Sequence, residues 1–289
     1  MIEDVELLKD IEFFQREEIT EYYIYRYLAE KEENEENRKI LIQISDDELK
    51  HYNTWRELSG KDVEPNRAKI ALYRILYHIF GLVFTIRLME KGERKAEERY
   101  RKAAEKLDVA REILEDEFKH EDRLLSLLTD ERLQFIGSIV LGLSDALIEL
   151  TGALAGLSLA LYNTLLVGLA ALITGIAASM SMAVSEYLSK RSEGDPHALK
   201  GSLYTGLAYI LTVILLVLPY FLGMEITYSL LSSLVIASLI VGSLTFYTSV
   251  VREVTWRHEF IEMLILTMGV AFISFMIGYF IRIYFNIEV

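Results

Sequence analysis

Two short motifs place a carboxylate and an imidazole on one face of a helix. Glu48 precedes His51 by three residues, and Glu117 precedes His120 by the same interval. Side chains three apart are neighbours on a helix surface, so each pair can offer both groups to one ion. Hard carboxylate oxygens combined with imidazole suit iron and other first-row transition metals. The two motifs therefore predict a metal site built between two helices.

Two further stretches carry carboxylates that could complete this site. The first contains Glu17, Glu18 and Glu21; spacing alone leaves all three open as ligands, and we choose Glu18. The second contains Glu90 and Glu93. In ferritin-like bundles a pair of iron ions takes single Glu residues from two helices and Glu-x-x-His from two others. The expected di-iron ligands are Glu18, Glu48, His51, Glu90, Glu93, Glu117 and His120.

Helical patterns of apolar residues surround these candidates. Uninterrupted helical spacing predicts a first helix over residues 2–32. A second is expected from Glu35 to Leu58, because the stop signals Ser59-Gly60 and Pro65 follow it. A charged helix is expected to follow Gly92, and a fourth helix to span residues 109–128. Four helices of this kind would form an acidic bundle.

Residues 67–91 are more apolar and could be mistaken for a membrane span. They contain Arg74, His78 and Arg87, and Gly81 interrupts the apolar run. These features favour a crossover helix that packs in the bundle or lies on the membrane surface.

A long apolar hairpin, residues 135–189, carries a second group of candidates. Each half is long enough to cross a bilayer, which takes about 20 residues. The first half nevertheless contains Asp145 and Glu149, and the second contains Met182 and Glu186. Ionisable groups at membrane depth are costly and by default mark a transport route. A carboxylate supplies charge for a divalent cation, and a thioether favours a transition metal over Mg²⁺ or Ca²⁺.

Five spans are expected, and basic residues orient them. The spans cover residues 134–158, 163–189, 201–222, 227–250 and 260–284. Lysines and arginines gather before the first span and in the second-to-third and fourth-to-fifth connections, whereas the other two connections contain none. By the positive-inside rule the N-terminal domain is cytoplasmic and the C-terminus lies outside, with Arg282 as one dissenting residue.

Charge and composition separate the two halves of the chain. Residues 1–130 hold 23 Lys and Arg against 32 Asp and Glu, whereas residues 131–289 hold 7 against 11. An acidic domain argues against nucleic acid as a partner and is compatible with cations. The absence of cysteine excludes disulfides, thiolate metal sites and iron–sulfur clusters. The acidic N-terminus is not a secretory signal, so we expect the first domain in the cytosol.

Both halves resemble known families. The two Glu-x-x-His motifs and Glu90-x-x-Glu93 resemble the rubrerythrin/erythrin branch of the ferritin-like superfamily, over residues of about 5–128. GLSDAL (142–147) and SMAVSEYLS (181–189) resemble the vacuolar iron transporter family, whose members have five spans and form dimers. That second resemblance covers roughly residues 133–285. It implies that Asp145 and Met182 line the ion path and that Glu186 sits near its cytoplasmic mouth.

The chain departs from the transporter family in one connection. Eukaryotic members carry a long acidic metal-binding insert between spans two and three, but here residues 190–200 are too few to form it. The N-terminal ferritin-like domain is expected to take over the collecting role. This fused arrangement resembles the prokaryotic membrane-bound ferritins, which are implicated in iron efflux.

Together these observations predict an all-α protein with two domains. A ferritin-like four-helix bundle (residues 1–130) would precede a five-span transmembrane domain (residues 131–289). The expected activity is export of Fe²⁺, with Mn²⁺ as a second candidate cargo, by a homodimer of the cell membrane that exchanges metal for protons. The alternative is a membrane-anchored di-iron oxidase or peroxidase, since the ligand set could activate O₂. An anchor needs only one span, however, and would not place Asp145 at membrane depth.

Overall fold

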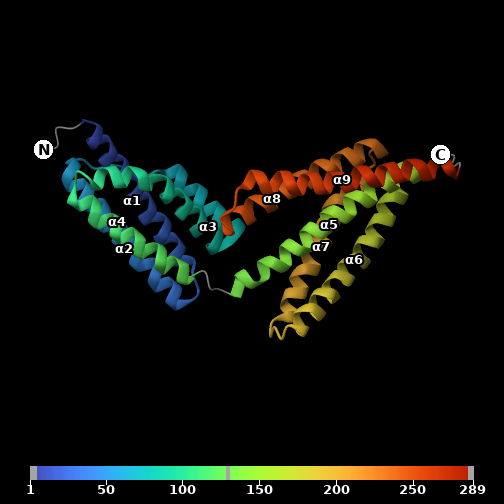
Figure 1. Ribbon diagram of the computed structural model, residues 1–289, viewed down its shortest axis with the longest axis horizontal. Helices are drawn as coiled ribbons and strands as arrows, with labels where there is room; N and C mark the ends of the chain where they lie inside the picture. Colours follow the sequence, from blue (N-terminus) through green and yellow to red (C-terminus); the bar gives the residue numbers. More distant parts are fainter. Residues whose placement is uncertain (1–4, 128–130, 286–289) are drawn as a thin grey trace. The chain divides into compact units, whose positions relative to one another are not determined.

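The computed structural model describes residues 5–127 and 131–285, without the side chains of residues 5, 93–97, 121–122, 125–127 and 131–134. Within these ranges every regular element is a helix (Figure 1). The chain divides into two compact units, Met1–Thr129 and Asp130–Val289.

The N-terminal unit consists of α1 (Val5–Lys31), α2 (Glu35–Ser59), α3 (Arg67–Ala104) and α4 (Asp108–Leu127). The helices pack in the pairs α1 with α2, α3 with α4, α1 with α3 and α2 with α4. Two apolar clusters fill the interior. One surrounds Leu28, Ile44 and Ile86, and the other surrounds Phe14 and Trp55.

The ends of α2 follow local chemistry, as the sequence predicts. The Asn34 side chain accepts hydrogen bonds from the backbone N–H groups of Glu36 and Asn37, which have no partner inside the helix. At the other end Gly60 adopts φ 64°, the left-handed conformation that glycine favours at a helix terminus. These caps set the register of the segment that carries Glu48 and His51.

The third helix differs from its prediction. We expected an apolar helix to end near Gly92 and a charged helix to follow it, but α3 continues through Gly92 and breaks at Gly81 instead. There the backbone has φ 83° and ψ −176°, which glycine adopts more readily than other residues because it has no Cβ. After the break, Leu82, Phe84 and Ile86 are buried. Gly81 thus separates the crossover part of α3 from the part that enters the interior.

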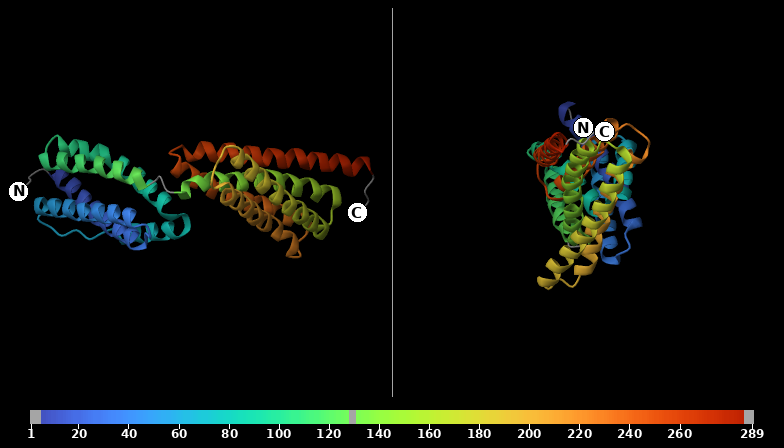
Figure 2. Two further views of the ribbon diagram at one scale, coloured as in Figure 1. Left: turned by 90° about the horizontal axis from the view of Figure 1, so that it is seen from below. Right: turned by 90° about the vertical axis from the view of Figure 1, so that its right-hand side faces the viewer.

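The second unit consists of the helices α5 (Glu131–Leu161), α6 (Thr164–Ser192), α7 (Ala198–Phe221), α8 (Ile226–Val251) and α9 (Trp256–Tyr284). Each corresponds to one of the five predicted spans. The helix α5 contacts each of the other four, and both pairs α5–α9 and α6–α7 pack along much of their length (Figure 2). The helices of this unit therefore gather around α5, which carries Asp145 and Glu149.

Glycines bring α5 and α9 into close contact. A Cβ added at Gly278 would clash with the carbonyl oxygen of Gly156, and one at Gly152 would lie 2.9 Å from the Val270 Cγ1 atom. The Gly152-x-x-x-Gly156 spacing thus serves packing within one chain, as small residues commonly do between membrane helices.

Six helical segments of the described residues are long and apolar enough to cross a membrane. Five are the helices of the second unit, and the sixth is the Arg67–Gly92 part of α3. These segments identify a multi-pass membrane protein.

Candidate metal centre and membrane carboxylates

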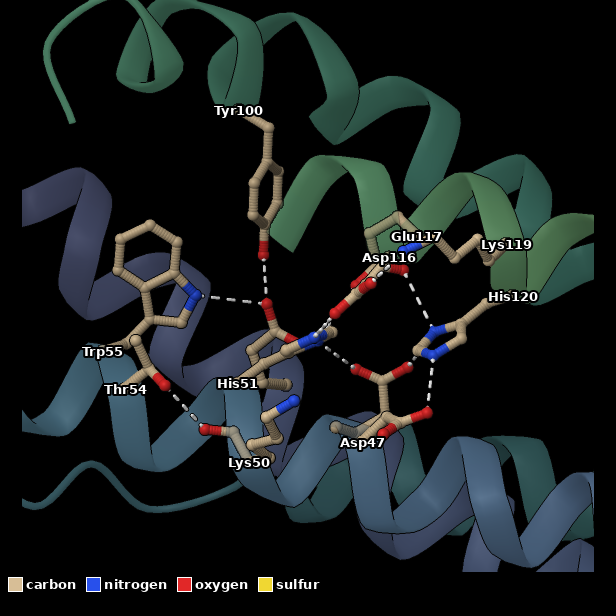
Figure 3. Close-up of polar contacts among 12 residues, drawn as sticks. Asp47, Lys50, His51, Thr54, Trp55, Tyr100, Asp116, Glu117, Lys119 and His120 are labelled. Atoms are coloured by element: carbon tan, nitrogen blue, oxygen red, sulfur yellow. Dashed lines mark hydrogen bonds and ion pairs between the residues drawn. The ribbon is translucent and has the colours of Figure 1, made fainter. Parts of the chain in front are cut away.

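A group of carboxylates and imidazoles meets inside the N-terminal unit. One ligand atom from each of Glu18, Glu48, His51 and Glu117 lies within 4.8 Å of the others. They come from α1, α2 and α4, and Glu18, Glu48 and His51 are almost completely buried. Figure 3 shows the histidine from α2 and the side chains from α4 turned toward one another. The structure therefore brings the two Glu-x-x-His motifs together.

Glu48 and Glu117 each face both histidines. The His51 Nδ1 atom lies 3.6 Å from Glu48 Oε2 and 3.3 Å from Glu117 Oε1. The His120 Nδ1 atom lies 3.3 Å from Glu48 Oε1 and 3.7 Å from Glu117 Oε2. The imidazole rings are 5.8 Å apart between centroids and stacked. Two carboxylates between two imidazoles form a nearly symmetric donor set that suits a pair of cations.

Two aspartates contact the outer nitrogens of these histidines, and each belongs to the opposite motif. Asp47, beside Glu48, lies 3.3 Å from the Nε2 atom of His120. Asp116, beside Glu117, lies 3.7 Å from the Nε2 atom of His51. A carboxylate hydrogen-bonded to the second ring nitrogen fixes the orientation and basicity of a metal-ligating histidine, and Asp47 lies at that distance from His120. Asp116 lies beyond hydrogen-bond distance from His51 and acts on it through its charge. We did not predict these contacts, although the repeated sequence Asp-Glu-x-Lys-His at residues 47–51 and 116–120 was a readable signal.

Two aromatic side chains hold Glu18 in place. Its Oε1 atom accepts hydrogen bonds from the Tyr100 hydroxyl at 2.6 Å and from the Trp55 Nε1–H at 3.2 Å (Figure 3). Phe14 packs against both rings, with centroid distances of 4.0 Å to Tyr100 and 5.2 Å to Trp55. The other carboxylate oxygen, Oε2, lies 3.6 Å from the His51 Nδ1 atom. Glu18 thus keeps only Oε2 for a cation.

The other two candidates on α1 have a different partner. The Lys69 ammonium lies 2.6 Å from Glu17 Oε2 and 3.0 Å from Glu21 Oε1. Burial raises the pKa of Glu21 to about 8, against the opposing charge of Lys69. Among Glu17, Glu18 and Glu21, the structure therefore places only Glu18 beside His51.

The structure does not place the predicted ligands of the third helix in the group around His51. Glu90 is buried but lies 3.4 Å from the Arg87 Nη1 atom and is not part of the group around His51. The side chain of Glu93 lies outside the described residues.

Burial and mutual contact shift the ionisation of the group. Burial opposes protonation of His120, but Glu117 and Glu48 outweigh it and raise its pKa to about 11. The pKa of His51 is also raised, because the same two carboxylates and Glu18 outweigh burial. Burial and the charge of Glu117 raise the pKa of Glu48. For Glu117 the two histidines outweigh burial and lower the pKa to about 2. Without a cation, protons on the histidines balance the carboxylates.

The donor atoms fit a transition-metal cation. Glu18 Oε2, Glu48 Oε2, His51 Nδ1 and His120 Nδ1 are buried and have no hydrogen-bond partner among the described residues. Unsatisfied buried polar atoms are uncommon in proteins, and such a group is explained when an ion completes it. Carboxylate oxygens with imidazole nitrogens match the preferences of Fe²⁺ and Mn²⁺.

Removing the Asp47 carboxylate should weaken metal binding without removing a ligand. Loss of such a hydrogen-bonded partner typically costs roughly 10- to 100-fold in metal affinity. We expect this loss in the Asp47→Asn variant, measured by calorimetric titration with Mn²⁺. The neighbouring Asp46→Asn is the matched control, because Asp46 is exposed and pairs with Arg26 at the surface. Equal affinities for the two variants would contradict the role given to Asp47.

The predicted transport residues lie on two membrane-span helices. Asp145 is half-buried on α5, and Glu149, one turn later, is exposed in the single chain. The Glu149 Oε2 atom accepts a hydrogen bond at 2.6 Å from the hydroxyl of Tyr209, which is buried on α7. Tyr209 lies 60 residues from Glu149 in sequence, and no sequence motif had indicated this contact. These two carboxylates therefore share a face of α5 that the chain itself leaves partly uncovered.

On α6, Met182 packs half-buried against the apolar core of the second unit. Glu186 accepts a hydrogen bond from the Ser138 hydroxyl at 2.9 Å and lies 3.5 Å from the Lys190 ammonium. Glu186 thus has partners within the chain, and it lies near the C-terminal end of α6, where Lys190 and Arg191 also lie.

These features define an all-helical, multi-pass membrane protein with a buried group of side chains able to hold a metal ion. Residues 136–198 match the family model described as the VIT family. The match spans α5, α6 and their connection, and it includes Asp145, Glu149, Met182 and Glu186. It indicates a membrane transporter of metal, iron in particular. Searches of curated proteins and of solved structures gave no significant match.

Proposed function

We propose that this protein exports Fe²⁺ from the cytoplasm, with Mn²⁺ as a second cargo, and exchanges it for protons. The observation that carries the proposal is the pair of carboxylates, Asp145 and Glu149, inside a membrane-span helix of the VIT-matched segment. A carboxylate at membrane depth is retained only where function needs it, and it can exchange a divalent cation for a proton. Met182 adds a thioether that favours a transition metal.

In this proposal the N-terminal unit is a ferritin-like bundle that captures or senses Fe²⁺. The buried set of Glu18, Glu48, His51, Glu117 and His120 would hold the ions, with a third-helix carboxylate completing the half at His120. When bound, the ions supply Lewis acidity and one-electron chemistry. The protein side chains orient the ligands and take up or release the balancing protons. Oxidation would produce Fe³⁺, a poor cargo for a path built on carboxylates and a thioether, so we favour capture.

The proposed topology has five spans and places the N-terminal unit in the cytoplasm. The Arg67–Gly92 segment is assigned to the N-terminal unit, because it breaks at Gly81 and its second part is buried among α1, α2 and α4. Loops rich in Lys and Arg face the cytoplasm, and the basic connections of this chain lie on the same side as the N-terminal unit in the proposed topology. The partner proposed for the exposed face of Asp145 and Glu149 is a second copy of the chain, since a carboxylate facing lipid would be costly.

Fe²⁺ entry into sealed proteoliposomes tests the proposal. An internal dye quenched by iron and a pH dye report the two fluxes for wild type and Asp145→Ala. We expect Fe²⁺ flux and opposite proton movement from wild type and neither from the variant. Glu225→Ala, which removes a carboxylate at the start of α8, is the control and should transport normally. Equal flux for wild type and Asp145→Ala would refute the path.

A further inference from the structure

The crossover part of α3 presents an aliphatic stripe that no described residue covers. Leu72, Ile75 and Ile79 are 52%, 56% and 64% exposed, and their spacing places them on one helix face. On the opposite face Ile70 and Tyr73 are buried in the interior. This part of α3 therefore has apolar side chains on two faces, and only one of these faces is buried within the chain. We call Leu72, Ile75 and Ile79 the α3 stripe.

The cations of the segment that carries the α3 stripe differ in their partners: Arg67 lies 3.0 Å from Glu64, Lys69 contacts Glu17 and Glu21, and Arg87 lies 3.4 Å from Glu90, whereas Arg74 lies over the ring of Tyr27. Residues 67–89 contain Arg67, Lys69, Arg74 and Arg87 but no Asp or Glu, although the domain as a whole is acidic. Arg74 is exposed and belongs to the same turns of helix as Ile75. An exposed aliphatic stripe with an exposed arginine in the same turns is typical of a helix that lies in the plane of a membrane surface.

Aromatic residues with polar tips lie beside these cations. The Arg74 guanidinium sits 4.7 Å from the ring centroid of Tyr27, and the Tyr27 hydroxyl lies 2.8 Å from the Nε2 atom of His78. Tyr77 packs edge-on against Tyr27 at 6.1 Å. Tyrosine and arginine are typical of the headgroup level of a bilayer, where one end of a side chain is apolar and the other is hydrated.

The same chain carries membrane-span helices, and little sequence separates the two units. The N-terminal unit ends with α4 at Leu127, and the first membrane-span helix begins at Glu131. We propose that the α3 stripe inserts into the headgroup region of the bilayer, with Arg74 facing anionic phospholipid. A second copy is a less suitable occupant, because a two-fold contact through the stripe would bring like charges together. Anionic lipids of a cytoplasmic leaflet attract basic side chains such as Arg74.

Spin labels can test this placement in the intact protein, because the native chain contains no cysteine. The Ile75→Cys and Glu57→Cys variants, each labelled with a nitroxide, are reconstituted into vesicles that contain phosphatidylglycerol. Collision rates with oxygen, which enriches in lipid, and with a water-soluble nickel complex report the depth of each label. Glu57 is the control because it is exposed on α2, away from the stripe.

We expect the oxygen-to-nickel ratio at position 75 to exceed that at position 57 several-fold. Equal ratios would place the stripe in water and overturn the proposal. Dipolar broadening at position 75 that disappears on dilution with unlabelled protein would overturn it in favour of a second copy. A Leu72→Cys label should repeat the result of Ile75→Cys, which excludes a local effect of one substitution.

Discussion

Replacing Glu117 by glutamine should lower the affinity of the N-terminal unit for Fe²⁺ roughly 100-fold or more. Loss of a hydrogen-bonded partner behind a ligand typically costs roughly 10- to 100-fold in metal affinity, and loss of a carboxylate that itself faces the ion should cost at least as much. Glu117 faces both His51 and His120, at 3.3 Å and 3.7 Å, so its loss affects both halves of the donor set. An uncharged amide can neither balance a cation nor hold the histidines toward it.

Anaerobic titration with Fe²⁺ measures the effect, and thermal unfolding of the metal-free protein tests whether the variant folds. The matched control is Glu115→Gln, because Glu115 is exposed on the same helix. A folded Glu117→Gln protein that binds Fe²⁺ as tightly as Glu115→Gln would show that the metal site lies elsewhere.

The second large effect is a steep dependence of metal binding on pH. In the metal-free protein, neighbouring carboxylates outweigh burial and raise the pKa of both His51 and His120, the latter to about 11. A histidine must lose a proton from its ligating nitrogen to bind a cation, so binding near neutral pH releases protons. Each released proton raises log affinity by about one per pH unit. With both histidines involved, affinity should rise roughly 100-fold for each unit between pH 6 and pH 8.

Calorimetric titrations with Mn²⁺ in buffers of different ionisation enthalpy count the released protons. We expect at least two protons per filled site, one for each histidine, with any proton held by Glu48 in addition. His78→Ala is the control, because it removes an exposed histidine of the same unit that contacts Tyr27 and not the donor group, so the count should stay unchanged. Affinity that stays constant between pH 6 and pH 8 would mean that the histidines are not ligands.

Local signals in the sequence were sufficient for most of the helices and for the two Glu-x-x-His pairs. Gly60 ends α2 where the stop signals predict, because such signals act within a few residues. Glu48 with His51 and Glu117 with His120 share a face because of the helical repeat alone. The apolar runs of the second unit identify its helices by length, since a bilayer sets a minimum span.

Contacts between distant segments could not be predicted in the same way. Trp55 and Tyr100 reach Glu18 across 37 and 82 residues, and both contacts depend on how three helices are aligned along their axes. The choice among Glu17, Glu18 and Glu21 depends on Lys69, which approaches only after the crossover folds back. The sequence contains two glycines at which this helix could break, Gly81 and Gly92. It breaks at Gly81 because the residues that follow, such as Leu82 and Phe84, are buried in the interior, and this packing could not be read from the sequence.

The crossed aspartates show a signal that was present but not used. Asp47 contacts the histidine of α4 and Asp116 contacts the histidine of α2, so each motif supports the ligand of the other. Such exchange couples the geometry of the two helices.

The most direct test of iron export against the alternative of a membrane-anchored oxidase is to follow iron and oxygen in the same vesicles. Sealed proteoliposomes of the wild-type protein would receive external Fe²⁺ while an internal dye records iron entry and an electrode records dissolved O₂. The proposal predicts internal Fe²⁺ that rises with little loss of O₂. Consumption of O₂ in proportion to the added Fe²⁺, with no iron reaching the interior, would contradict it and identify an anchored oxidase.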